Sequence, residues 1–275
     1  MNNTNEPSSQ SMARRSFVKG VAAIGGVLLT TATGAYTADA QQEPPKNFVF
    51  RTHPITAKEL VAELREELQP VDEQIRQHPY LLALQKKAVS LEALKAFPGH
   101  EYHTVQSDLR SMAHLVQRFG HHPLAGPFLH GVLQGEVAGL AQVVQMGKKL
   151  GMSEADLQRY EVTPAGFAYP TYMAWQALYG SAAAVVGGLL VNFAAWGHNC
   201  GVMSAALQAH YGFTSAETAF LDGFAALPPF DEVALPIIQD GLKQGVKPAE
   251  IKRTARLFQA YEKLFWDSLA QLATL

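Results

Sequence analysis

Cysteine is almost absent from this chain of 275 residues, which contains Cys200 alone. A single cysteine cannot form an internal disulfide, so we expect the hydrophobic core alone to stabilise the fold. Charge is also scarce, because Asp, Glu, Lys and Arg make up 17% of the residues and the formal net charge is −2. Clustered Lys and Arg are missing, so we predict that nucleic acid is not a partner.

Several catalytic signatures are missing as well. The sequence has neither a G-x-S-x-G motif nor a glycine-rich phosphate loop. It also lacks Glu-x-x-His, which a helical di-iron site takes from each of two helices. We therefore predict no metal ion and no cofactor. A metal- or haem-dependent oxidase remains an alternative, because haem needs only one axial histidine. Its candidate ligands are Glu101, His103, Glu136 and His198.

Residues 1–40 have the features of an export signal. Paired Arg14 and Arg15 precede a glycine-rich apolar run over about 21–35, and the cleavage-like triplet Ala-Asp-Ala occupies 38–40. The string RRSFVK resembles the twin-arginine export motif. We expect a periplasmic protein with no membrane span after cleavage. Residues 41–54 are then a proline-containing linker to a helical domain over 55–275.

The signal assignment makes a direct prediction. Replacing both arginines (Arg14→Lys with Arg15→Lys) should leave the protein in the cytoplasm at full length, because the export machinery reads the arginine pair. Cell fractionation and the mass of the product measure this. Unchanged processing near Ala40 in the double variant would contradict the twin-arginine assignment.

Residues 181–211 contain no Asp, Glu, Lys, Arg or Pro and are rich in Ala and Leu. As a helix they would extend about 45 Å, which suits either a membrane span or the central helix of a core. Asn192, Trp196 and Asn199 follow one another along one face at helical spacing. Glycines and amides interrupt the apolar run, which favours the core. A buried amide must find partners, so these asparagines either cross-link helices or line a polar cavity.

The rest of the domain is also predicted as helices. A capping box at Thr56 and Glu59 opens the first helix, which should end near Pro70. Further helices are expected over 71–87, a short segment after Ser90, 100–119 after a Pro98-Gly99 bend, 124–150, 153–160, 164–179, a segment opened by Thr214, 231–243 and 248–273. No period-two stretch is long enough for a strand. The prediction is an all-α, single-domain bundle around a long central helix.

Acidic residues interrupt the apolar faces of three of these helices. Glu262 lies in the stripe of the last helix, Glu136 in that of 124–150, and both Glu101 and Asp108 in that of 100–119. A buried carboxylate is costly unless it is paired or functional. One such residue suggests a structural ion pair, for instance with Arg110 or Arg118. Several of them favour a polar pocket.

Aromatic residues crowd 164–179. Most rings at this spacing pack helices together, but one or two can stack against a flat heteroaromatic ligand. We take Tyr169 and Tyr172 as the candidates. Cys200 is more simply explained as a small buried hydrophobe, because His198 points to a different helix face.

Four strings together resemble the TenA/thiaminase II family, which has the haem-oxygenase-like all-helical fold. They are HPYLLAL at 78–84, LEALKAFPGHEYH at 91–103, PAGFAYPTYMAW at 164–175 and AYEKLFWDSL at 260–269. The resemblance covers about residues 55–270. It implies a central pocket for thiamin-derived pyrimidines, hydrolysis of a C–N bond or an amino group, and a homo-oligomer.

The resemblance also implies roles for individual residues. Glu262 matches the C-terminal catalytic glutamate, and Tyr169 a tyrosine that contacts the pyrimidine. Glu101 stands where the family has an aspartate that holds the pyrimidine. A count without gaps places Asn192 where the family has its cysteine nucleophile. An amide cannot attack as a thiolate does, so the resemblance implies a divergent member without that nucleophile.

The leading hypothesis is therefore a protein that binds, and can hydrolyse, an amino-pyrimidine or similar flat amine. Glu262 and Glu101 are the expected catalytic residues. The expected ligand contacts are Asp108, Tyr169, Tyr172, Asn192 and Trp196. The alternatives are a non-catalytic ligand-binding or assembly protein and the oxidase described above.

Overall fold

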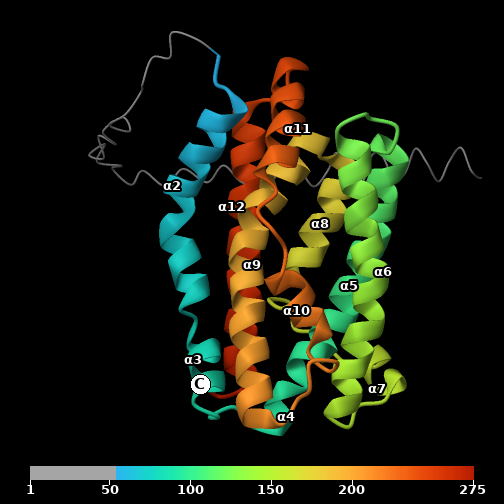
Figure 1. Cartoon of the computed structure of the whole chain (residues 1–275), viewed down its shortest axis with the longest axis vertical. Coiled ribbons are helices and arrows are strands. Elements are labelled where there is room, and N and C mark those ends of the chain that lie inside the picture. Colours follow the sequence, from blue (N-terminus) through green and yellow to red (C-terminus); the bar gives the residue numbers. More distant parts are fainter. Residues whose placement is uncertain (1–53) are drawn as a thin grey trace, which may run out of the picture. The chain divides into compact units, whose positions relative to one another are not determined.

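In the computed structural model, which describes residues 54–275, the chain is a bundle of α-helices (Figure 1). In chain order the helices are α2 (Ala57–Arg76), α3 (Pro79–Gln85), α4 (Leu91–Leu94), α5 (Ala96–Phe119), α6 (Ala125–Lys149), α7 (Glu154–Gln158), α8 (Ala168–Tyr179), α9 (Ala182–Tyr211), α10 (Ala219–Ala225), α11 (Asp231–Lys243) and α12 (Pro248–Leu272). The described residues contain no strand, which confirms the all-α prediction. The expected signal and all but the last residue of the linker lie outside the described residues.

The first two helices differ from the prediction. The expected end near Pro70 is wrong, because α2 continues through this proline to Arg76. Pro70 is exposed, so water can serve the carbonyl group that loses its intrahelical partner. The predicted helix over 71–87 is instead divided at His78, the N-cap of α3, whose Nδ1 accepts the Tyr80 N–H at 3.3 Å.

Two other helix starts are also corrected. α5 begins at Ala96, so Pro98 lies in its first turn, where backbone N–H groups have no intrahelical partner in any case. The helix expected from Thr214 begins only at Ala219. Before it, the Glu217 carboxylate accepts the N–H and O–H of Thr214 at 2.8 and 3.0 Å. The residues predicted to cap a helix therefore form a turn.

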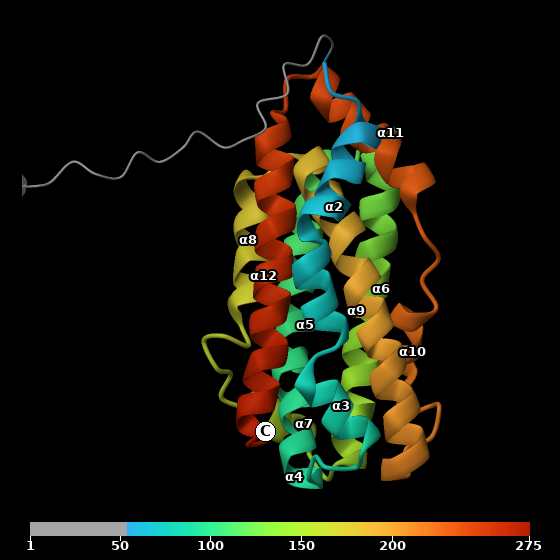
Figure 2. The ribbon, with the colours of Figure 1, turned by 90° about the vertical axis from the view of Figure 1, so that its left-hand side faces the viewer.

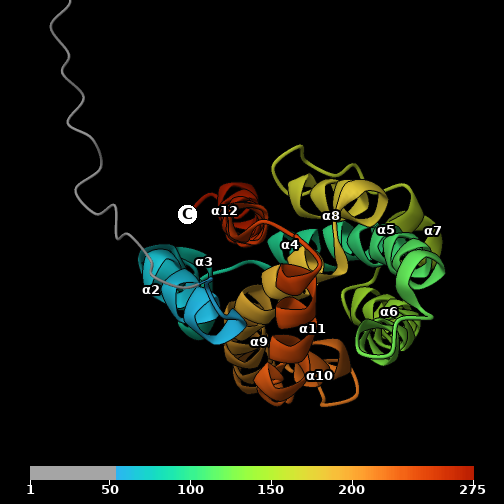
Figure 3. The same cartoon turned by 90° about the horizontal axis from the view of Figure 1, so that it is seen from above.

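The uncharged stretch forms the central helix α9. Ser181 caps its start by accepting the Ala184 N–H at 3.2 Å, and Gly212 ends it with a left-handed φ of 69°. α9 packs against α2, α3, α10, α11 and α12, as the view along the bundle shows (Figure 3). Across residues 54–275, no helix has both the length and the hydropathy of a membrane span. The core interpretation of this stretch is therefore the one that the structure supports.

The long helices run side by side along the bundle (Figure 2). The hydrophobic core between them consists of two apolar clusters, and the long helices contribute residues to both. The change from one cluster to the other falls at corresponding places in four helices. These places lie between Val105 and Met112 in α5, Leu129 and Val143 in α6, Val191 and Ala195 in α9, and Phe258 and Phe265 in α12. Asp108, Glu136, Asn192 and Glu262 fall within these intervals. The acids therefore form a polar layer between two apolar halves.

Candidate functional site

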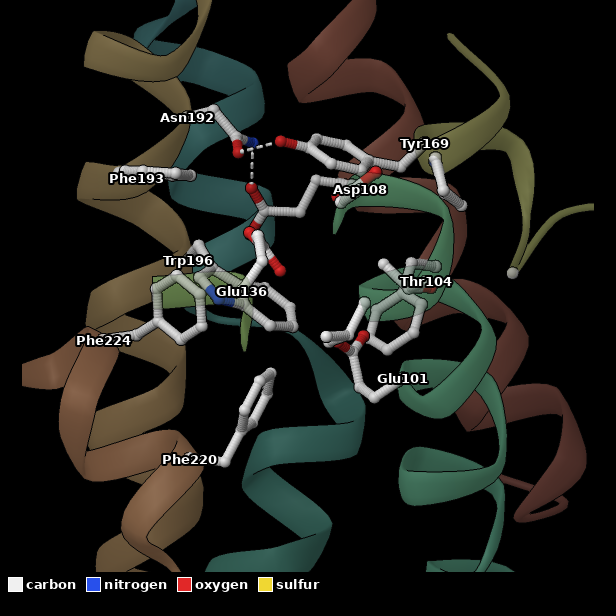
Figure 4. Close-up of a pocket in the computed structure, with 15 residues that line it drawn as sticks. Glu101, Thr104, Asp108, Glu136, Tyr169, Asn192, Phe193, Trp196, Phe220 and Phe224 are labelled. Atoms are coloured by element: carbon white, nitrogen blue, oxygen red, sulfur yellow. Dashed lines mark hydrogen bonds between the residues drawn. The ribbon is translucent and has the colours of Figure 1, made fainter. Parts of the chain in front are cut away.

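A cavity of about 60 Å³ lies at this polar layer. Residues from α5, α6, α8, α9, α10 and α12 line it, so it lies where most of the bundle converges. The lining residues are Glu101, Thr104, Val105, Asp108, Glu136, Gly166, Tyr169, Pro170, Asn192, Phe193, Trp196, Phe220, Phe224, Glu262 and Phe265. In the close-up, Asn192 and Tyr169 lie at one end, Phe220 lies at the other, and Glu136 lies between them (Figure 4).

Glu262 is held by hydrogen bonds from two sides. Its Oε1 accepts the Trp266 Nε1–H at 3.2 Å, and its Oε2 accepts the side-chain amide of Asn192. The side chain is 3% exposed. Burial raises the pKa of Glu262 to about 8, although the bonds from Trp266 and Asn192 act to lower it. A carboxyl group that titrates near neutral pH is suited to transfer protons.

Asn192 connects the two sides of the cavity. Its Oδ1 accepts the Tyr169 hydroxyl at 3.2 Å, and its amide also donates to Gln259 Oε1 at 3.1 Å. Gln259 in turn donates to Asp72 at 3.2 Å, and Asp72 pairs with Arg76 at 2.6 Å. The amide therefore positions both Glu262 and Tyr169. Of the two roles predicted for the buried asparagines, Asn192 has the one of lining a polar cavity. Asn199 has the other predicted role and links two helices, because its side-chain amide on α9 donates to the Ile75 carbonyl of α2 at 3.0 Å.

The remaining acids share the cavity with Glu262. Burial raises the pKa of Glu101 to about 8, and the charges of Glu136 and Glu262 raise it further in the same direction. Burial raises the pKa of Glu136 to about 7. The pKa of Asp108 is also raised, first by burial and then by Glu136 and Glu101. These carboxyl groups hold protons that ordinary surface acids release well below neutral pH.

No Lys, Arg or His belongs to the described residues that line the cavity. Arg118, a suggested ion-pair partner, instead donates to the Ala177 carbonyl at 2.6 Å. Arg110 is exposed. Of the six buried side-chain atoms without a hydrogen-bond partner among residues 54–275, two belong to the cavity lining, Asp108 Oδ1 and Thr104 Oγ1. A ligand that donates hydrogen bonds or carries positive charge would complete this lining.

The structure brings most of the predicted site residues together. Glu101, Asp108, Tyr169, Asn192, Trp196 and Glu262 all line the cavity. Tyr172 lies outside this lining. Its ring packs against Phe258 and Tyr261 of α12 and stacks on Trp175 of α8. Its hydroxyl accepts a hydrogen bond from Gln176 at 2.6 Å. Tyr172 is thus one of the packing aromatics of α8.

Sequence patterns alone did not single out Thr104, Phe193, Phe220 or Phe224 as lining residues. Phe220 and Phe224 are four residues apart on α10, and their rings meet at 5.3 Å. That spacing was the available signal, but it fits ordinary packing equally well. Only the contact of α10 with α9 and α6 shows that these rings close one side of the cavity.

The proposed oxidase ligands are not assembled around one point. His198 is exposed on α9 and lines a separate surface hollow with Gln85 and His210. Glu101 and Glu136 face the buried cavity instead. Within the described part of the chain, no group of three or more His, Cys, Asp or Glu side chains has the geometry of a metal site.

Cys200 is fully buried and is not part of the cavity lining. Burial raises the pKa of its thiol well above the usual range, so the thiolate needed for attack is disfavoured. We predict that Cys200→Ala leaves any hydrolytic activity within roughly a few-fold of the parent. Thiol-alkylating reagents should not inhibit it either. Cleavage of thiamin that alkylation abolishes would contradict this assignment.

Comparison with solved structures shows the fold of this domain. A TenA homolog from Pseudomonas syringae pv. tomato has a TM-score of 0.67 at 19% identity, covering 80% of this chain and 98% of its own. A TenA homologue from P. horikoshii gives 0.63 at 18%, covering 78% and 99%. Heme oxygenase-1 from Synechocystis, in complex with heme, gives 0.56 at 15%, covering 78% and 91%. The haem-oxygenase-like fold expected from the sequence is therefore confirmed.

A search among curated proteins finds no match. The model of the TENA/THI-4/PQQC family matches residues 65–271, most of the described domain. This match includes every residue that lines the cavity. The chain belongs to the TENA/THI-4/PQQC family.

Proposed function

We propose that this protein binds a small, flat amine of the amino-pyrimidine class in the acid-lined cavity and hydrolyses a C–N bond of it. The observation that carries the proposal is the lining itself. Four carboxyl groups, from Glu101, Asp108, Glu136 and Glu262, face a buried space whose described lining has no cationic side chain. Family membership supports a small-molecule ligand, and the aromatic walls suit a flat ring.

The residues of the cavity have complementary roles in this proposal. Glu101 accepts hydrogen bonds from an amino group of the ligand, and Asp108 Oδ1 and Thr104 Oγ1 offer two further acceptors. Tyr169 and Trp196 contribute ring surface on opposite sides. Asn192 keeps Tyr169 and Glu262 in place through its hydrogen bonds to both. The ligand thus meets acceptors at its amino groups and aromatic rings at its faces.

Water is the nucleophile in the proposed reaction, because no thiol lines the cavity in the described part of the chain. An amine R–NH₂ and water give R–OH and ammonia. Glu262 takes a proton from the attacking water and returns a proton to the departing nitrogen. A pKa of about 8 allows one carboxyl group to do both near neutral pH.

Binding without turnover is the second candidate function. Asn192 favours it, because this side chain occupies the position that the family resemblance gives to a nucleophile and its amide is fully engaged in hydrogen bonds. Haem fits the cavity poorly: the described lining offers no histidine, cysteine or methionine as an axial ligand, and the space is about 60 Å³.

Isothermal titration with 4-aminopyrimidine and with pyrimidine tests the proposal. We expect the amino compound to bind at least about tenfold more tightly, because its amino group satisfies buried carboxyl acceptors. An ammonia assay on the same samples separates hydrolysis from binding alone. Equal binding of the two rings would contradict the proposed role of the acids.

A further inference from the structure

An apolar groove of about 620 Å³ opens on the surface beside the acid-lined cavity. It lies between α6, α9, α10 and α11. The stacked rings of Phe128 and Phe230, 5.4 Å apart, form part of its wall, and Leu227 and Val233 are exposed along it. Glu136 and Gln142 are the only polar side chains among its described lining residues. An exposed apolar hollow of this kind marks a binding surface more often than a random part of a surface does.

The groove and the cavity have a common wall. Glu136, Phe193, Phe220 and Phe224 line both spaces. The rings of this wall meet edge to face, with Phe224 at 5.9 Å from Phe193 and at 5.3 Å from Phe220. These four side chains are therefore what separates the two spaces.

The sizes of the two spaces indicate how a ligand uses them. A dry cavity of about 150 Å³ is known to hold benzene, whereas the acid-lined cavity has about 60 Å³. A flat ring with an amino group therefore needs part of the wall to move, and the space behind that wall is the groove. Whatever the ring carries on its far side then lies among apolar side chains.

We propose that the groove is the entrance to the cavity and a subsite for an apolar arm of the ligand, so that the ligand class is an amine bearing a hydrophobic substituent. This inference rests on the proposed function, because it takes the acid-lined cavity as the site of the amino group. Gly131, Gly135 and Gly223 line the groove and have no atom within 4 Å of the place where a Cβ would lie, so a side chain at these positions would extend into open space.

The test is a calorimetric series with 4-aminopyrimidine, its 6-ethyl, 6-butyl and 6-hexyl derivatives, which carry the chain on a ring carbon and leave the amino group free, and n-hexylamine. We expect affinity to rise by roughly two- to fourfold per methylene from ethyl to hexyl, as apolar surface leaves water. Gly131→Leu fills the groove away from the acids, and leucine favours the helix more than glycine does. Val233→Asp places a charge beside the groove in the first turn of α11, where a carboxylate suits the helix. Each variant should remove the gain with chain length.

Ala141→Leu is the matched control, because Ala141 is exposed on α6 and lies outside the groove. This variant should keep the dependence on chain length.

Equal affinities for all chain lengths in the parent, or an unchanged gain in Gly131→Leu, overturn the inference. Binding of 4-aminopyrimidine in the same series preserves the proposed function. If n-hexylamine binds and Gly131→Leu blocks it while 4-aminopyrimidine does not bind, the subsite stands and the proposed function fails. A change of molar mass in Gly131→Leu by light scattering, without any effect of chain length, makes the groove a subunit contact and overturns the inference.

Discussion

Glu262→Gln is expected to lose hydrolysis of an amine ligand while the protein still folds. Glutamine cannot take a proton from water or return one to nitrogen, and loss of general acid–base catalysis costs roughly 10²–10⁴-fold in rate. The fold should remain because no cation is left without a partner. The nearest cation in the hydrogen-bond network is Arg76, which pairs with Asp72 at 2.6 Å. Ammonia release at saturating ligand and thermal unfolding are the two measurements.

A structural role for Glu262 makes the opposite prediction. Breaking a buried ion pair destabilises a protein by roughly 3–5 kcal/mol. If Glu262 is catalytic and has no cationic partner, the glutamine variant loses only one of the two hydrogen bonds that Glu262 accepts from Asn192 and Trp266, which costs about 1–3 kcal/mol. Glu161→Gln, in an exposed loop, is the matched control and should leave both turnover and unfolding unchanged. Full turnover in Glu262→Gln with a large fall in melting temperature would contradict the catalytic role.

Glu101→Gln is expected to change how stability depends on pH. The pKa of Glu101 is about 8 in the folded protein and 4.5 for an ordinary glutamate. Between these pH values the folded protein holds a proton that the unfolded chain has released, so the free energy of unfolding falls as pH rises from about 4.5 to about 8. The contribution is fully present below pH 4.5 and is lost above pH 8. Glutamine does not titrate, so the free energy of unfolding of the variant lacks this fall with rising pH.

The expected gain is large at alkaline pH. At about pH 9 the variant should be more stable than the parent by roughly 3–5 kcal/mol, whereas at about pH 4.5 the two should differ little. Urea unfolding over this range measures the difference. The exposed Glu161→Gln variant is the control for the removal of one surface carboxylate. Parallel curves for Glu101→Gln and the parent would show that the pKa of Glu101 is not raised in the folded protein. In a separate titration, we expect Glu101→Gln to weaken binding of 4-aminopyrimidine.

The sequence alone determined the fold class and the presence of a central helix. Apolar residues at helical spacing, the Ser181 cap and Gly212 are local signals, and a helix is closed by bonds between neighbours in the chain. The acids on apolar faces were visible for the same reason, since the face of a helix follows from its period. The helix boundaries predicted at the prolines were wrong, because the effect of a proline depends on its exposure and on its position in the helix. Pro70 is exposed inside α2, and Pro98 lies in the first turn of α5.

Tertiary structure alone decided which of these side chains share one space. Asp108, Glu136, Asn192 and Glu262 belong to four helices, and their common level depends on how those helices slide past one another. Tyr169 and Tyr172 look alike in sequence, yet only Tyr169 lines the cavity, where its hydroxyl donates to Asn192, whereas the Tyr172 hydroxyl accepts from Gln176 within α8. The common wall of Phe193, Phe220 and Phe224 likewise exists only where α9 and α10 meet. Periodicity along a chain assigns a residue to a face of its helix, but the packing of that face against other helices determines what the residue contacts.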